Sequence, residues 1–320
     1  MLSDRLVLAA CVLIAISAVA FALTSNDIYL VSVLIWIATN ALLAASLRFV
    51  LLIGELNLGT AAFFGIGAYA AGIATTMLQA PFLVALLAGV LAAAAVSAVF
   101  GYMTLRVKGP YFLLIAFAFT EVVRLIYTQT SAIGGNSGMI GIFPPIWMDP
   151  YFAALMIAIV ALVLFGLYAV EQGTLGRTFK AIENNENIPR SVGINVLGVK
   201  VLCLVLASAA AGLGGALHAH SNNVISPGDF SFLIAVFALA YVKIGGQRHI
   251  LGAVLGAAVL TTLGQFALRF GTHEHVFYGA AIIFAMLVMP NGLLGLFDRI
   301  QHAVAHRLGA KSVAAEGKAP

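Results

Sequence analysis

Long runs of apolar side chains constrain this sequence more than any other feature. Of its 320 residues, 62% are apolar, and Asp, Glu, Lys and Arg together make up only 9%. Soluble domains carry about 25% charged residues, so this chain has too few to cover a surface exposed to water. Because a helix that spans a bilayer needs roughly 20 apolar residues, the runs predict a membrane protein built of many helices.

Ten apolar runs alternate with polar or turn-forming segments, and we expect each run to form one helix. They cover residues 6–23, 30–47, 57–78, 82–105, 111–128, 151–170, 201–220, 230–243, 250–270 and 276–296. The first is expected to be an uncleaved helix. The run at 230–243 is short for a full crossing, which suggests a tilted, broken or re-entrant helix. The predicted fold class is therefore all-α, a polytopic bundle of about ten transmembrane helices.

The basic residues predict how these helices are oriented. If the N-terminus lies in the cytoplasm, 14 of the 16 Lys and Arg residues fall in cytoplasmic segments, whereas the outside loops hold acidic residues such as Asp27 and Asp229. Segments rich in Lys and Arg stay in the cytoplasm. We therefore expect both termini to be cytoplasmic, with residues 1–298 forming one transmembrane domain and 299–320 a cytoplasmic tail.

Motifs for catalysis are missing from the sequence. It has neither a Gly-x-x-x-x-Gly-Lys-Ser/Thr phosphate loop nor a Gly-x-Ser-x-Gly nucleophile elbow, so we expect no enzyme activity and no ATP binding by that route. The His-x-His pairs at 218–220 and 273–275 point neighbouring rings to different helix faces, so we expect no metal and no other cofactor. Scattered basic residues also argue against nucleic acid as a partner.

Three ionisable residues are expected at membrane depth: Glu55, Glu121 and Arg124. A charge in hydrocarbon is costly, so such side chains face the bundle interior or a partner. Glu121 and Arg124 are three residues apart and can pair on one helix face. The pair is either structural or borders a passage for a zwitterionic substrate, so these three residues are the candidates for a translocation path.

The segment from Glu171 to Lys200 is the longest hydrophilic interruption of the apolar pattern. Within it, Leu175, Phe179 and Ile182 recur at helical spacing among charged neighbours. A short amphipathic helix of this kind can dock into a groove of a partner or lie on the lipid surface. With many spans and no nucleotide motif, the chain resembles a transport pathway that a partner drives.

Glycine is abundant, with 32 residues, many of them inside the apolar runs, as at 212–215. Small residues let helix backbones approach closely in lipid, so we expect these glycines to mark helix contacts.

Several short motifs, taken together, resemble a known family. They are Gly-Thr-Ala-Ala-Phe-Phe-Gly-Ile-Gly-Ala-Tyr at 59–69, Arg-Val-Lys-Gly-Pro-Tyr-Phe at 106–112, Glu-Val-Val-Arg at 121–124, Gly-Gly-Asn-Ser-Gly at 134–138 and Pro-Asn-Gly-Leu-Leu-Gly at 290–295. Their order and spacing, from about residue 40 to 297, resemble the LivM-type permease subunits of branched-chain amino acid ABC importers.

The resemblance implies a bacterial inner-membrane permease subunit that forms the translocation path for leucine, isoleucine, valine or a related small amino acid or amide. It implies four kinds of partner: a second, LivH-type permease subunit, two ATP-binding-cassette subunits, a periplasmic or extracellular substrate-binding protein, and membrane lipid. ATP hydrolysis would be carried out by the partner subunits.

The resemblance also implies that the segment 171–200, between the sixth and seventh transmembrane helices, is a cytoplasmic coupling segment that meets the ATPase. It maps the following residues onto that region: Gly176, Arg177, Ala181, Ile182, Asn185, Glu186 and Gly193. The chain departs from the family pattern at Glu183-Asn184 and at Pro189. Because proline cannot continue a helix, we expect two short helices in this segment.

The main alternative is an ion-coupled secondary transporter of small zwitterions, which would use broken helices and carboxylates near the bilayer midplane. Only Glu55 and Glu121 are available for that role, and the segment 171–200 would then have no purpose. A membrane-embedded assembly or sensor protein without transport is a third interpretation.

Overall fold

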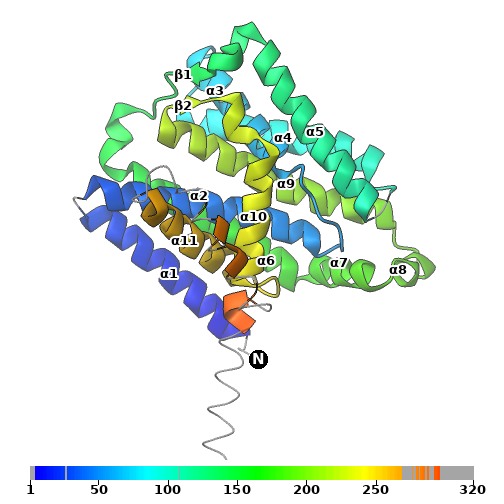
Figure 1. Ribbon diagram of the computed structural model, residues 1–320. Coiled ribbons are helices and arrows are strands. Elements are labelled where there is room, and N and C mark those ends of the chain that lie inside the picture. The colour runs from blue at the N-terminus through cyan, green and yellow to red at the C-terminus, as the bar shows by residue number, and fades with distance from the viewer. Residues whose placement is uncertain are drawn as a thin grey trace, which may run out of the picture.

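The computed structural model describes residues 4–25, 27–107 and 109–268, with scattered residues between 276 and 295. Within these ranges the chain is a bundle of α-helices with a few short 3-10 turns and one small ribbon (Figure 1). The helices are α1 (Asp4–Thr24), α2 (Ile28–Leu51), α3 (Thr60–Thr76), α4 (Phe82–Thr104), α5 (Pro110–Gln129), α6 (Phe152–Gln172), α7 (Thr174–Asn184), α8 (Asn187–Ser191), α9 (Val196–Asn222), α10 (Phe232–Gly245) and α11 (Ile250–Ala267).

Six of the described helices are long and apolar enough to cross a membrane: α2, α4, α5, α6, α9 and α11. Helices α3 and α10 and residues 13–24 of α1 are apolar but shorter. The prediction of a helical membrane bundle is therefore confirmed. Nine of the ten apolar runs correspond to helices, whereas the run at 276–296 lies for the most part outside the described residues. The number of spans stays a prediction.

Helix α9 lies at the centre of the bundle, packed against α2, α3 and α4 (Figure 1). Glycines permit this packing, because a Cβ atom at Gly67 of α3 would overlap the backbone of Gly212 of α9. Likewise, a Cβ at Gly215 would overlap the carbonyl group of Phe64. The backbones of α3 and α9 are thus in direct contact, as expected for small residues between membrane helices.

One end of the bundle carries irregular segments, and we name it the ribbon end. Strand β1 (Met139–Ile140) pairs antiparallel with β2 (Val224–Ile225), with Met139 opposite Ile225. The 3-10 turns here are η1 (Ser131–Ile133), η2 (Gly135–Ser137), η3 (Ile146–Tyr151) and η4 (Pro227–Phe230). Helix α10 follows η4 and has 14 residues, so the run at 230–243 forms a short helix entered through irregular backbone.

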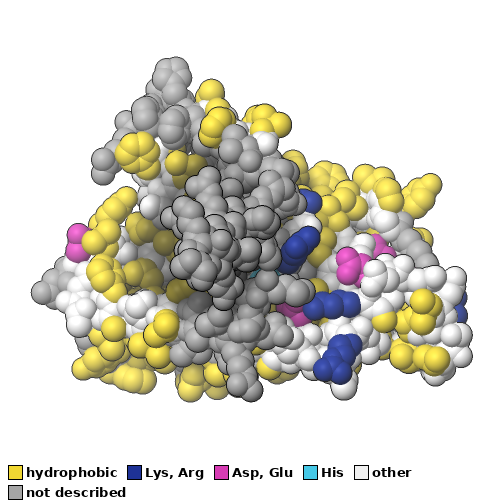
Figure 2. Space-filling model, turned by 90° about the horizontal axis from the view of Figure 1, so that it is seen from below, with side chains coloured by type: hydrophobic (Ala, Val, Ile, Leu, Met, Phe, Trp, Pro, Cys, Tyr) yellow, Lys and Arg dark blue, Asp and Glu magenta, His cyan; other side chains and the backbone are white. Residues whose placement is uncertain are grey.

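The other end carries α7 and α8, and we name it the basic end. In the face that Figure 2 shows, the visible Lys and Arg side chains gather at the side of the molecule where these two helices lie. Arg48 stands in the last turn of α2, Lys243 in the last turn of α10, and Lys200 near the start of α9. Basic residues thus lie at the end of the bundle where α2 and α10 end and α9 begins. This is the pattern that the positive-inside rule describes.

Candidate functional site

The segment formed by α7 and α8 packs back onto the bundle. The aromatic ring of Phe179 is fully buried and meets the ring of Phe49 edge to face, with centroids 5.7 Å apart. Ile182 is also buried, whereas Leu175 is 37% exposed. Two residues of the predicted apolar stripe, Phe179 and Ile182, are therefore buried in the chain's own bundle, and Phe179 packs on α2, whereas Leu175 stays exposed.

The segment consists of two short helices, as predicted, but the break falls at Asn185 and not at Pro189, which stands in the first turn of α8, where proline is tolerated. Asn185 has extended backbone (φ −164°, ψ 109°) and separates α7 from α8. Pro189 lies within α8 and is buried. At the start of the segment, a Cβ at Gly176 would overlap the backbone of Glu171, so a glycine there allows α7 to turn tightly away from the end of α6.

A buried ion pair lies beneath α7. The Nη1 and Nη2 atoms of Arg48 donate to the two carboxylate oxygens of Glu171 at 2.7 and 2.9 Å. The same guanidinium donates through Nε to the carbonyl of Gln247 and through Nη2 to the carbonyl of Arg248, both at 2.9 Å. Lys180 of α7 lies 3.6 Å from Glu171. Arg48 therefore joins α2, the end of α6 and the loop between α10 and α11.

A second group of charges lies beneath α8. The Nζ atom of Lys200 is 3.0 Å from Glu55 Oε1 and 2.6 Å from Glu186 Oε1. The other oxygen of Glu55 accepts a hydrogen bond from the backbone N–H of Gly109 at 3.2 Å. This lysine therefore connects α9, the residues just before α8, and the loop between α2 and α3.

We name these six residues the ionic network: Arg48, Glu55, Glu171, Lys180, Glu186 and Lys200. Four of its members are at most 4% exposed, namely Arg48, Glu55, Glu171 and Lys200. Removing an ion from water costs several kcal/mol, and the cost is offset only when opposite charges and hydrogen bonds surround it. Each buried charge here has such a partner, so the network fixes the position of α7 and α8 on the bundle.

The structure divides the predicted coupling residues between two faces of the segment. Gly176 and Ile182 are buried against the bundle, and Glu186 binds Lys200. Arg177, Asn185 and Gly193 are exposed, while Ala181 is partly buried. The exposed residues are thus accessible to a partner, and the buried ones anchor the segment. Their part in coupling remains a prediction.

The three candidate residues for a translocation path lie in two places. Glu121 and Arg124 form an ion pair on α5, with 2.8 Å between Glu121 Oε2 and Arg124 Nε, and their side chains are 26% and 34% exposed. Glu55 lies in the loop before α3 and belongs to the ionic network. Among the described residues, no hydrogen bond or ion pair joins Glu55 to the other two.

Sequence reasoning missed four members of the ionic network: Arg48, Glu171, Lys180 and Lys200. Arg48 and Glu171 are 123 residues apart in the sequence, and at that separation no local pattern relates them. One signal was present for three of them, since Arg48, Glu171 and Lys200 each stand directly next to the end of an apolar run. The sequence alone does not tell which helix ends meet.

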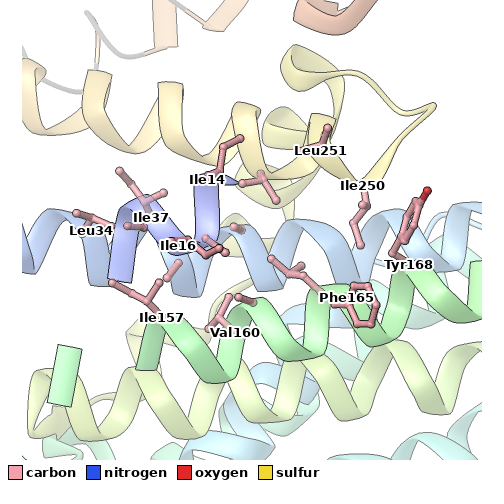
Figure 3. A pocket seen from close by; sticks show the side chains of 17 residues that line it. Ile14, Ile16, Leu34, Ile37, Ile157, Val160, Phe165, Tyr168, Ile250 and Leu251 are labelled. Atoms are coloured by element: carbon pink, nitrogen blue, oxygen red, sulfur yellow. The ribbon is translucent and has the colours of Figure 1, made fainter. Parts of the chain in front are cut away.

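An apolar cavity of about 240 Å³ lies between α1, α2, α6 and α11. Figure 3 shows side chains such as Ile14, Ile37, Ile157 and Val160 lining it. A zwitterion would have to leave its charges unpaired among these hydrocarbon groups, which is strongly unfavourable. This cavity is therefore unsuited to an amino acid.

Metal binding finds no support in the described part of the chain, where no three His, Cys, Asp or Glu side chains lie close enough to share an ion. The ring of His220 instead lies 3.0 Å from Thr75 Oγ1 and 2.8 Å from the carbonyl of Ala216. Cys203 is a free, buried thiol.

The bundle of apolar helices defines a polytopic membrane protein, and the segment of α7 and α8 is anchored at its basic end. A family model described as "Branched-chain amino acid transport system / permease component" matches residues 29–289. The chain therefore belongs to this family of transport permeases.

Individual relatives agree with the family model. The chain is 28% identical over 272 residues to the high-affinity branched-chain amino acid transport system permease protein LivM of Escherichia coli. This match covers 75% of the present chain and 64% of LivM. It is 28% identical over 288 residues to the high-affinity branched-chain amino acid transport system permease protein BraD of Pseudomonas aeruginosa. That match covers 81% of the present chain and 92% of BraD. The probable branched-chain amino acid transport permease protein LivH of Methanocaldococcus jannaschii is 30% identical over 149 residues, which are 43% of the present chain and 46% of LivH.

The chain thus spans 64% of the length of the LivM relative. No solved structure matches the chain.

Proposed function

We propose that this chain is a membrane-spanning subunit of an ATP-binding-cassette importer that carries leucine, isoleucine, valine or a related small amino acid or amide. Membership of the branched-chain amino acid permease family supports this function. The similarity to LivM and BraD, whose names describe high-affinity branched-chain amino acid transport, supports the substrate class.

Four further subunits would complete the importer. The chain resembles LivH permeases as well as LivM over part of its length, which fits a pair of related permeases that form the path together. Because its sequence has no phosphate-binding loop, two separate ATPase subunits would supply the energy. A binding protein on the outer side would deliver the substrate.

The observation that carries this proposal is the anchored segment of α7 and α8. Its exposed face offers Arg177 and Asn185 to a partner, and its buried face is tied to α2, α6 and α9 by the ionic network. A movement of an ATPase bound to the exposed face would reach these three helices through stiff, buried contacts. Such a rigid link suits a transporter that alternates between two states.

The proposed topology places the basic end in the cytoplasm of a bacterial cell, with the bundle in the inner membrane and both termini cytoplasmic. The basic residues at the ends of α2 and α10 and at the start of α9 support this orientation. Ten spans would result if the run at 276–296 also crosses. Residues 1–298 then form the permease domain and 299–320 a tail.

An ion-coupled secondary transporter is not favoured. Its coupling ion would need free carboxylates in the membrane, but Glu55 is paired with Lys200 and Glu121 with Arg124.

The test is uptake of labelled leucine, isoleucine and valine into proteoliposomes that contain the permease pair, the ATPase subunits and the binding protein. We expect uptake to require ATP and the binding protein and to stop when vanadate blocks the ATPase. Ionophores that collapse ion gradients should leave it unchanged. Uptake without ATP that follows an ion gradient would contradict the proposal.

A further inference from the structure

A second cavity, of about 360 Å³, lies between α2, α9, α10 and α11 and reaches the ribbon end of the bundle. Its volume lies at the small end of the range of about 300–1,000 Å³ that is typical of ligand sites. Unlike the apolar cavity of Figure 3, it is lined by several polar side chains, among them Asn40, His218, Asn222, Asp229 and Gln265. None of these was identified from the sequence as a site residue.

The cavity extends from an exposed rim to a buried floor. Asn222 and Asp229 at the rim are exposed, whereas Thr39 and Thr261 are only 1% and 7% exposed. Asn40 is only partly exposed and donates a hydrogen bond to Thr261 Oγ1 at 3.0 Å. Polar groups are unfavourable inside a membrane bundle unless they bind one another, water or a ligand. The cavity is thus polar at both its rim and its floor, which suits a polar ligand better than lipid.

Asp229 contributes the negative charge of this cavity and is held in a defined position. It stands in the turn η4, where its Oδ2 atom accepts a hydrogen bond from the backbone N–H of Ser226 at 2.8 Å. In the described part of the chain, no Lys or Arg forms an ion pair with Asp229. A carboxylate fixed in this way at the rim can bind a positively charged group that arrives from outside the bundle.

Side-chain N–H groups lie on the other walls. The indole Nε1 of Trp36 lies 3.4 Å from Asn222 Oδ1 and donates to it, and Asn222 Nδ2 is 2.9 Å from His218 Nε2. Gln265 adds a further amide from α11. Since the single N–H of Trp36 is used by Asn222, the neutral donors left for a ligand are the amide groups of Asn222 and Gln265. Together with the carboxylate of Asp229 they match a molecule that carries one ammonium group and one carboxylate.

We propose that this cavity binds a small zwitterionic amino acid by its polar head, with Asp229 binding the ammonium group and the amide groups of Asn222 and Gln265 binding the carboxylate. The substrate class rests on the proposed function. The new element is a binding site inside this single subunit, separate from the Glu121–Arg124 pair on α5.

Tryptophan fluorescence offers a direct test. The sequence has two tryptophans, of which Trp36 lines the cavity and Trp147 is 77% exposed at the ribbon end. In a Trp147→Phe background, the full chain in lipid nanodiscs reports on the cavity through Trp36 alone. We expect leucine to change this fluorescence in a saturable way, and isoamylamine, which keeps only the amino group, to compete with it. Isocaproate, which lacks the amino group, should not compete.

Two matched variants isolate the charge of Asp229. Asp229→Asn keeps an oxygen that can accept the Ser226 N–H, so the turn is retained while the charge is lost. Because a hydrogen bond to a charged group contributes more than a neutral one, we expect leucine affinity to fall about tenfold or more. Asp27→Asn is the control, since Asp27 is an exposed helix cap near the same end and asparagine caps equally well. It should leave the titration unchanged.

The results separate this site from the proposed function. The fluorescence titration needs no ATPase, so leucine binding that depends on Asp229 would support the site even if ATP-driven uptake failed. If leucine leaves the Trp36 fluorescence unchanged, or if Asp229→Asn and Asp27→Asn titrate alike, the proposed site is wrong. Loss of uptake in Asp229→Asn with normal leucine titration would also overturn it, because the residue would then act on the binding protein.

Discussion

Arg48 and Glu171 form a bidentate ion pair between helix ends that are 123 residues apart in the sequence. The planar guanidinium matches the two carboxylate oxygens, a geometry that lysine cannot reproduce. Because Glu171 stands at the end of α6, just before α7 begins, this pair determines where the segment of α7 and α8 leaves the bundle. The position of the proposed ATPase contact thus depends on a buried interaction with α2.

Neutralising Glu171 should strongly destabilise the protein. In Glu171→Gln, Arg48 keeps its charge at 1% exposure without a carboxylate partner, and breaking a buried pair in this way costs about 3–5 kcal/mol. Denaturant unfolding of the purified chain in detergent micelles measures the loss. Lys180→Met is the control, because Lys180 is 49% exposed and 3.6 Å from the same carboxylate, so its loss should cost no more than about 1 kcal/mol. Equal effects in the two variants would contradict the assigned role of Arg48.

The helices of this fold could be predicted because their signal is local. The apolar run at 82–105, for example, corresponds to α4 (Phe82–Thr104) almost residue for residue. The ribbon of β1 and β2 was not predicted, since strands of two residues are too short to show the alternation that identifies a strand. Its pairing joins two loops that are far apart in the sequence.

The candidate site was predictable in part. The spacing of Phe179 and Ile182 indicated a helix with one apolar face, and the structure confirms that helix. The surface that this face covers could not be predicted, because Phe49 belongs to a distant helix. Glu55 drew attention as a charge in an apolar region, but its partner Lys200 is 145 residues away, so the sequence could not separate an ion pair from a transport path.

Glu186 should couple ATP hydrolysis to transport. In Glu186→Gln, Lys200 keeps Glu55 as a partner, so the fold is retained, but the charged contact between the α7–α8 segment and α9 is lost. We expect membrane insertion to be normal and the amount of amino acid imported per ATP hydrolysed to fall several-fold. Parallel measurement of uptake and phosphate release in proteoliposomes gives this ratio. Glu183→Gln, on the exposed side of α7, should keep the wild-type ratio, and a normal ratio in both variants would refute the coupling role.

Arg177 and Ile182 should affect different properties, since they lie on opposite faces of α7. Arg177 is exposed and Ile182 is 2% exposed. Arg177→Ala should weaken co-purification of the ATPase subunits and leave stability unchanged. Ile182→Ala should destabilise the protein by about 2–5 kcal/mol through the cavity that it creates. If Arg177→Ala purifies with its full complement of ATPase, that residue does not contribute to the contact.

The Glu121–Arg124 pair can be tested by neutralising both residues at once. Because each partner balances the other at 2.8 Å, the double variant Glu121→Gln, Arg124→Gln leaves no unpaired charge, and the complex should assemble normally. If the pair borders the path of a zwitterion, leucine uptake should fall although the amount of assembled complex does not. Wild-type uptake in this variant would show that the pair is only structural.

Gly212 should tolerate no side chain. A Cβ atom there would lie 2.5 Å from the Cβ of Ala93 and 2.9 Å from the carbonyl oxygen of Gly89, and both of these atoms belong to α4, which cannot retreat without separating from α9. Overpacking of this kind typically costs about 1–3 kcal/mol, so Gly212→Ala should lower the free energy of unfolding by that amount in detergent micelles. Gly166→Ala on α6 is the matched control, since a Cβ at Gly166 meets no atom within 4 Å among the described residues. Alanine also stabilises a helix relative to glycine by about 0.5–1 kcal/mol, so this control should be neutral or slightly more stable. A Gly212→Ala protein as stable as the control would show that α4 and α9 are packed less tightly than the structure indicates.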